Sequence, residues 1–83
     1  MKVKVKMPKL GLTMTKGKIV EWKKAAGDQV AAGEILLVIE TEKADVEIEA
    51  PAAGAITEII GTVAGVYQVG EVIAVIDVPG PRT

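Results

Sequence analysis

One lysine, Lys43, lies in a short acidic stretch of the sequence. Its neighbours include the carboxylates of Glu40, Glu42, Asp45 and Glu47. A nucleophilic or Schiff-base lysine needs a desolvated or cation-flanked amine, whereas carboxylates in a polar turn favour the ammonium form. Such an amine can still be joined to a carboxylic acid as an amide when a separate enzyme supplies the activated acyl donor. The residues around Lys43 therefore favour a covalent carrier or a solvated surface charge over a catalytic lysine.

The composition excludes most other catalytic and metal chemistry. The 83 residues contain no cysteine and no histidine, which removes thiolate nucleophiles, disulfides, sulfur metal sites and the commonest general base. Ten basic and eleven acidic side chains nearly cancel, so we expect no attraction to nucleic acid or to an anionic membrane. No apolar run approaches the roughly 18 residues of a membrane span. The alternating N-terminal MKVKVKM does not resemble a secretory signal, and we expect a cytoplasmic, metal-free protein that is not an enzyme by itself.

The segments on either side of Lys43 are typical of β-strands. Residues 34–39 are mostly apolar and partly β-branched, and residues 46–50 alternate apolar with acidic side chains. Only residues 40–45 lie between them, which predicts a tight hairpin with Lys43 at its tip. Nine glycines and well-spaced prolines supply turns for an all-β domain.

An internal repeat relates the two halves of the chain. VKVKMPKLG (3–11) matches VEIEAPAAG (46–54), GKIVEW (17–22) matches GAITEI (54–59), and GEILLVIE (33–40) matches GEVIAVID (70–77). The offset changes between the first match and the others, so the first half carries six extra residues between Leu10 and Gly17. Each half is too small to bury its own apolar face. We therefore predict two four-stranded antiparallel sheets packed with pseudo-twofold symmetry, in which neither half folds alone and Lys43 occupies the one hairpin that the repeat does not duplicate.

Apolar positions of both halves are predicted to meet in one core. The expected members are Val5, Ile19, Trp22, Val30, Ile35, Leu37, Ile39, Ile48, Ile56, Ile59, Val69, Val72, Val75 and Ile76. Trp22 matches Ile59 in the repeat, which indicates packing rather than ligand stacking.

The sequence resembles the lipoyl domains of 2-oxo acid dehydrogenase complexes over essentially its whole length. The matching segments are MPKLG (7–11), GKIVEW (17–22), AAGDQVAAGEILLVIETEKA (25–44), APAAG (50–54) and VGEVIAVI (69–76). The resemblance implies a flattened barrel or barrel-sandwich hybrid, with the modified lysine on an exposed turn opposite the chain ends. The carrier domain is expected to span residues 1–78, and the prolines of residues 79–83 suggest the start of a linker.

The same resemblance implies a covalent cofactor and a set of partners. Lys43 is the position that receives lipoic acid in amide linkage, and Thr41, Glu42 and Ala44 are expected to contribute to recognition by a lipoate ligase or lipoyl transferase. The lipoylated domain, a monomer in isolation, would shuttle acyl groups and reducing equivalents among a thiamine-dependent dehydrogenase, an acyltransferase core and dihydrolipoyl dehydrogenase. PKLGLTM (8–14) is more similar to the pyruvate or acetoin type of complex, although the 2-oxo acid is not determined by these features.

Two other functions fit a hairpin lysine. Biotinyl carrier domains of carboxylases are similar in fold but typically flank the lysine with methionines, whereas Glu42 and Ala44 flank Lys43 here. An unmodified β interaction module, with Lys43 as a solvated charge, is the second alternative.

The six-residue excess is a second candidate functional feature. It carries Leu12 and Met14, apolar residues on a loop that the family fold places near the lysine turn. We predict that Leu12 and Met14 contribute to docking of the thiamine-dependent dehydrogenase. A tolerated surface insertion is the alternative.

Overall fold

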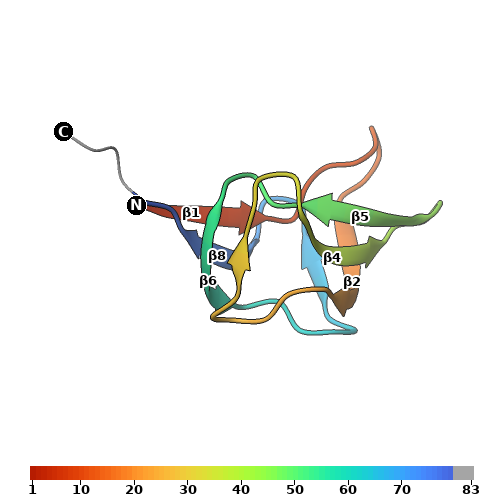
Figure 1. Ribbon diagram of the computed structural model, residues 1–83. Helices are drawn as coiled ribbons and strands as arrows, with labels where there is room; N and C mark the ends of the chain where they lie inside the picture. The colour runs from red at the N-terminus through yellow and green to blue at the C-terminus, as the bar shows by residue number, and fades with distance from the viewer. Residues whose placement is uncertain (80–83) are drawn as a thin grey trace.

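The computed structural model describes residues 1–79 and consists of eight strands joined by turns and loops (Figure 1). The strands are β1 (Lys2–Lys6), β2 (Lys16–Trp22), β3 (Gln29–Val30), β4 (Ile35–Glu40), β5 (Asp45–Glu49), β6 (Gly54–Ile59), β7 (Val66–Gln68) and β8 (Val72–Asp77). In this part of the chain there is no helix long and apolar enough to cross a membrane. Of the expected linker, residues 80–83 lie outside the described residues.

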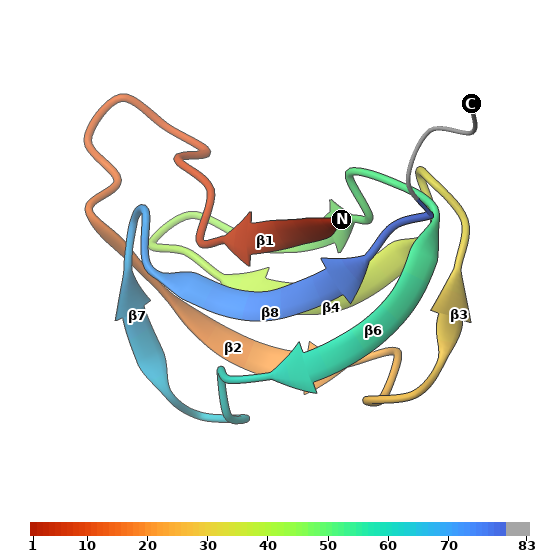
Figure 2. The same cartoon turned by 90° about the vertical axis from the view of Figure 1, so that its left-hand side faces the viewer.

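The strands form two four-stranded antiparallel sheets, as predicted. One sheet has the order β1-β8-β6-β3 and the other β5-β4-β2-β7. Each sheet therefore takes two strands from each half of the chain, and the two sheets face one another as a flattened sandwich (Figure 2). Because neither half contains a complete sheet, the apolar faces can be covered only when the halves interleave.

The pseudo-twofold symmetry extends to individual hydrogen-bonded positions. In the β2–β4 pair Ile19 lies opposite Ile39, and in the β6–β8 pair Ile56 lies opposite Ile76. The register shifts immediately after Ile19 and, in the same place, after Ile56. We call two positions related in this way symmetry counterparts. Counterparts differ by 43 in residue number from β1 to β5, and by 37 from β2–β4 to β6–β8.

The core contains only half of the residues predicted from the sequence, together with five others. The buried apolar residues are Val5, Met7, Ile19, Val30, Leu36, Leu37, Ile39, Ala50, Ile56, Ile73, Ala74 and Ile76. The other predicted members are only half-buried: Trp22, Ile35, Ile48, Ile59, Val69, Val72 and Val75. Register irregularities at Leu36 in β4 and at its counterpart Ile73 in β8 explain much of the difference. A β-bulge interrupts the alternation of side chains, so two consecutive residues of each strand can enter the core.

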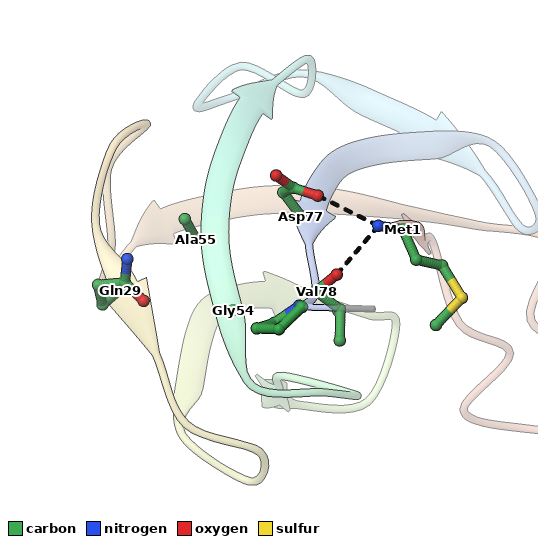
Figure 3. Close-up of a pocket in the computed structure, with 7 residues that line it drawn as sticks. Met1, Gln29, Gly54, Ala55, Asp77 and Val78 are labelled. Atoms are coloured by element: carbon green, nitrogen blue, oxygen red, sulfur yellow. Dashed lines mark hydrogen bonds and ion pairs between the residues drawn. The ribbon is translucent and has the colours of Figure 1, made fainter. Parts of the chain in front are cut away.

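The lysine turn and the N-terminus lie at opposite ends of the sandwich (Figure 1), and Val78 lies beside Met1. At the terminal end the backbone N–H of Val78 donates to the carbonyl oxygen of Met1 at 2.7 Å. The Met1 amine donates to the carbonyl oxygen of Val78 at 3.0 Å and lies 3.5 Å from the Asp77 carboxylate (Figure 3). Met1 and Val78 therefore occupy the place that is the symmetry counterpart of the lysine turn.

Candidate functional site

Lys43 lies at the exposed tip of the turn between β4 and β5. Glu40 and Asp45 are the last paired residues below the tip. The backbone N–H of Thr41 donates to the carbonyl oxygen of Ala44 at 2.9 Å and closes the turn. The hairpin predicted from the sequence is thus present, with its two strands paired up to the tip.

The hydroxyl of Thr41 organises the backbone of this turn. It donates to the carbonyl oxygen of Ala44 at 2.9 Å. It also accepts from the backbone N–H groups of Ala44 at 3.2 Å and of Lys43 at 3.4 Å. One half-buried side chain therefore holds the main chain of Lys43 while the lysine side chain stays in solvent. This structural contribution of Thr41 was not predicted from the sequence.

The ammonium group of Lys43 is not engaged by its acidic neighbours. The ion pairs within the described residues join Lys23 to Glu21 at 3.0 Å, Lys24 to Glu34 at 2.6 Å and the Met1 amine to Asp77 at 3.5 Å, and none involves Lys43. Glu40, Glu42 and Asp45 are exposed and near in sequence, yet their carboxylates lie beyond ion-pair distance. The amine is therefore presented free, which argues against a lysine kept only to neutralise the turn.

A groove of about 830 Å³ adjoins the lysine turn. Its walls come from residues 10–18, the turn itself including Lys43, Val46 of β5 and Val66 of β7. Leu12 is 95% exposed and Val66 55% exposed, so apolar surface faces solvent on two sides of the groove. The loop before β2 and the β4–β5 turn lie at the same end of the molecule (Figure 2).

The two loop residues predicted to dock a partner have different environments. Leu12 projects into solvent, whereas Met14 is half-buried and packs against the core. The sulfur of Met14 accepts the backbone N–H of Leu10 at 3.2 Å, and its methyl carbon would lie 3.1 Å from a Cβ at Gly17. Met14 thus anchors the loop, and of these two residues Leu12 is the one with a free apolar side chain.

Trp22 has a packing role away from the turn, as predicted. Its indole N–H donates to the carbonyl oxygen of Gly61 at 2.9 Å, and it lies opposite Leu37 in β4. The end of β2 that lies beside the lysine turn begins with Lys16, and Lys18 pairs with Glu40. Trp22 is therefore at the other end of its strand and lines no part of the groove.

The turn and the groove together place the residues singled out by the sequence at one end of the molecule. Thr41, Glu42, Lys43 and Ala44 are contiguous in the turn, and Leu12 lines the same groove. Val46 and Val66 were missed as site residues, because their alternating and β-branched context indicated only strand packing. Within residues 1–79 no group of three or more acidic side chains is placed to hold a metal ion.

These residues fit a covalently attached acyl group. The free amine can be acylated without breaking an ion pair, the Thr41 contacts hold its backbone in one geometry, and an apolar groove begins beside it. An amide at Lys43 would remove the positive charge and extend an apolar chain from the tip. The arrangement therefore presents the amine of Lys43 at the tip of the turn, whereas Lys16 and Lys18, which also line the groove, lie on β2.

Comparison with known proteins gives concordant matches. The family model described as "Biotin-requiring enzyme", which covers biotin- and lipoyl-attachment domains, matches residues 3–76. The acetyltransferase component of the pyruvate dehydrogenase complex of Corynebacterium glutamicum is 47% identical over 70 residues, 84% of this chain and 10% of that protein. The acetyltransferase component of the acetoin cleaving system of Bacillus subtilis is 48% identical over 59 residues, 71% of this chain and 15% of that protein.

A solved structure of the same architecture covers the chain almost completely. The lipoyl domain of the Azotobacter vinelandii 2-oxoglutarate dehydrogenase complex superposes with a TM-score of 0.77 at 28% identity, covering 94% of this chain and 99% of that domain. The chain thus spans only about a tenth to a seventh of the two acetyltransferases, but nearly all of the isolated domain. The similarity is to one module of a larger protein.

Proposed function

The chain belongs to the biotin- and lipoyl-attachment family, within its lipoyl domains, and we propose that Lys43 carries lipoic acid in amide linkage. The observation that supports this proposal is the free, exposed amine of Lys43 on a hydrogen-bonded turn at the end opposite Met1. A lipoyl group bound there would supply a dithiolane that takes up an acyl group with two electrons and gives them up again. The domain itself is a carrier and not a catalyst.

The residues of the turn prepare Lys43 for its acylation. The Lys43 nitrogen attacks the carbonyl carbon of an activated lipoyl donor, its proton is lost to the modifying enzyme, and the bond to the donor's leaving group breaks as the amide forms. Thr41 keeps the backbone of Lys43 in one position for this attack, which reduces the entropy lost on binding the ligase. Exposed Glu42 and the small Ala44 flank the amine and are proposed as contacts for the ligase.

The partners follow from the same proposal. We propose that the domain serves an acyltransferase component, receives acyl groups from a thiamine-dependent 2-oxo acid dehydrogenase, and is reoxidised by dihydrolipoyl dehydrogenase. A pyruvate or acetoin complex is the favoured setting, since the aligned segments of relatives of both types are 47% and 48% identical to this chain. We propose a cytoplasmic location for it. Covalent tethering of the domain to such a component would raise the effective concentration of the arm at each active site.

Biotin attachment is the second candidate, because the matched family also includes biotin-carrying domains. Glu42 and Ala44 occupy the flanking positions that are typically methionine in biotinyl domains. The flanking residues disfavour biotin attachment. Because the family match includes it, the experiment below tests for biotin as well.

Intact mass spectrometry after coexpression distinguishes these functions. We expect one lipoyl increment with a lipoate ligase and lipoate, and none with a biotin ligase and biotin. The increment should disappear in Lys43→Arg and persist in Lys4→Arg, which changes an exposed lysine of β1. A biotin increment would replace the proposal with the second candidate, and no increment in either culture would favour an unmodified module.

A further inference from the structure

The geometry points to a resting site for the acyl chain of lipoylated Lys43 in the groove between the β1–β2 loop and the lysine turn. This inference rests on the proposed function and extends it, because it assigns Leu12 and Val66 to binding of the arm itself. The ligand is a saturated, uncharged acyl chain ending in a dithiolane, already tethered to the groove at Lys43. The arm would then exchange between the groove and solvent.

The pseudo-twofold symmetry provides an internal comparison for the groove. At the terminal end, the counterpart surface is a hollow of about 390 Å³ lined by Met1, Gln29, Gly54, Ala55, Asp77, Val78 and Pro79 (Figure 3). Most of these are counterparts of groove residues. For example, Asp77 corresponds to Glu40 and Val78 to Thr41. The groove at the lysine end is about twice as large, at about 830 Å³.

The extra volume comes from the six-residue insertion. Residues 7–15 connect β1 to β2, whereas only residues 50–53 connect β5 to β6. In the longer connection, residues 10–15 line one side of the groove and form an additional wall. Met14 anchors this wall, because its side chain packs against the core and its sulfur accepts a hydrogen bond from the N–H of Leu10. The additional wall therefore lies at the end of the molecule that carries Lys43. The short β5–β6 connection forms no such wall at the terminal end.

The groove is also more apolar than its counterpart. The apolar surface comes mainly from Leu12 and Met14 on the inserted loop, and from Val66 in β7, which corresponds to Gln29 in β3. At three other positions the lysine end is the more polar one, because Lys18, Thr41 and Glu42 correspond to Ala55, Val78 and Pro79. Leu12 and Val66 leave apolar surface exposed to water, which costs free energy unless something covers it. A volume of 830 Å³ lies in the range of small-molecule sites, which are concave and mostly apolar.

The tethered arm is the occupant that this site fits best. Lys43 itself lines the groove, so an acyl chain attached to it starts at the rim. Acylation removes the only charge on the arm, and intramolecular binding avoids the translational entropy that a free ligand would lose. The effective concentration of the chain at the groove is therefore high even if each contact is weak.

The test is nuclear magnetic resonance of the lipoylated domain against a matched short amide. The domain bearing lipoyl-Lys43 is compared with one bearing Nε-acetyl-Lys43, which also lacks the charge but has no chain. We expect nuclear Overhauser contacts from the arm to the methyl groups of Leu12 and Val66. We also expect shifts of the backbone amides in the loop and in β7 that the acetyl form does not show.

Substitutions supply a second readout, the rate at which iodoacetamide alkylates the reduced arm. Leu12→Ser and Val66→Gln, which installs the counterpart residue, should each weaken the contacts and raise that rate several-fold. Val63→Gln is the matched control, because Val63 is 58% exposed and lies outside the groove. Both Val66 and Leu12 are exposed, so neither change removes a core residue, and the amide spectrum of each unmodified variant verifies the fold.

The outcomes separate this inference from the function on which it rests. A lipoyl mass increment together with contacts that Val66→Gln weakens supports the resting site. An increment with amide spectra that match the acetyl form, and alkylation rates equal in all variants, overturns the resting site and leaves the carrier function standing. Absence of the increment overturns both.

Discussion

Thr41 is the residue on which the presentation of Lys43 depends most directly. Its hydroxyl makes three contacts with the backbone of Lys43 and Ala44, and its own N–H closes the turn. A flexible tip would present the amine in many geometries, of which a ligase could use few. The identity of this side chain should therefore affect lipoylation more than overall stability.

Replacing Thr41 with alanine should slow lipoylation of Lys43. Each hydrogen bond contributes about 1 kcal/mol, so loss of the hydroxyl should lower the initial rate by roughly fivefold or more, measured by mass spectrometry with purified lipoate ligase. Thr41→Ser keeps the hydroxyl and should retain most of the rate. If alanine and serine variants were modified at the same rate as the original, the positioning role of the hydroxyl would be wrong.

Substitution of Leu12 tests its predicted role in docking the thiamine-dependent dehydrogenase. Leu12→Ser should lower kcat/KM for reductive acylation by the cognate dehydrogenase by about tenfold, because burying a leucine contributes about 1.5–3 kcal/mol. Lipoylation should be unaffected, and Val63→Ser is the matched exposed control. If Leu12→Ser only released the arm from the groove, reductive acylation would not become slower. A lower rate in this variant therefore indicates weaker docking of the dehydrogenase. Equal rates in Leu12→Ser and Val63→Ser would refute it. Met14 is unsuitable for this test because it anchors the loop.

At the scale of elements, comparison of the two halves shows one position at which the residue type does not suit its backbone conformation. The turn before β3 contains Gly27 with φ of 96°, and its counterpart before β7 contains Ala64 with φ of 72°. The N–H groups of both residues donate across to the opposite half at 2.7 Å, Gly27 to Ile56 and Ala64 to Ile19. Glycine adopts positive φ without steric cost, whereas a residue with a Cβ does not.

We therefore predict that Ala64→Gly stabilises the domain and that Gly27→Ala destabilises it. The left-handed conformation costs alanine about 1–2 kcal/mol, part of which is offset by the greater chain entropy of glycine in the unfolded state. The free energy of unfolding from urea titration should rise by up to about 1 kcal/mol in the first variant and fall by a similar amount in the second. No atom would lie within 4 Å of a Cβ at Gly27, so a clash would not account for the loss. Opposite signs would contradict the argument from φ.

At the scale of the whole molecule, the interleaving of the two halves decides stability. β1 and β3 of the first half each pair only with strands of the second half, β8 and β6. A peptide of residues 1–42 would retain β2 and β4 as partners but would leave their apolar face uncovered. The core exists only when both sheets are complete.

We expect peptides of residues 1–42 and 43–83 to be unfolded when studied separately. Circular dichroism should show no cooperative thermal transition in either peptide, and their amide resonances should lack dispersion, whereas the intact chain should show both features. A cooperative transition in either isolated peptide would mean that one half carries its own core, contrary to the strand order.

Much of the architecture was predictable from local pattern. The two-residue alternation and the repeat indicated eight strands in two related halves, and the position of Lys43 between the repeats indicated its place at a unique hairpin. Trp22 was correctly expected to pack. These features depend on neighbours in sequence, so the chain itself carries the information.

The remainder required the folded chain. Pairing between strands produces the bulges at Leu36 and Ile73, and contacts with residues far along the chain produce the packing of Met14 against the core. The local backbone geometry of the turn produces the three hydrogen bonds of the Thr41 hydroxyl. The groove joins residues 10–18, the lysine turn and Val66, which no sequence spacing relates. The sequence by itself determined which amine is presented and on what kind of turn. Tertiary structure decided what surrounds that amine, because packing between distant segments depends on register and bulges that the alternation of residue types leaves open.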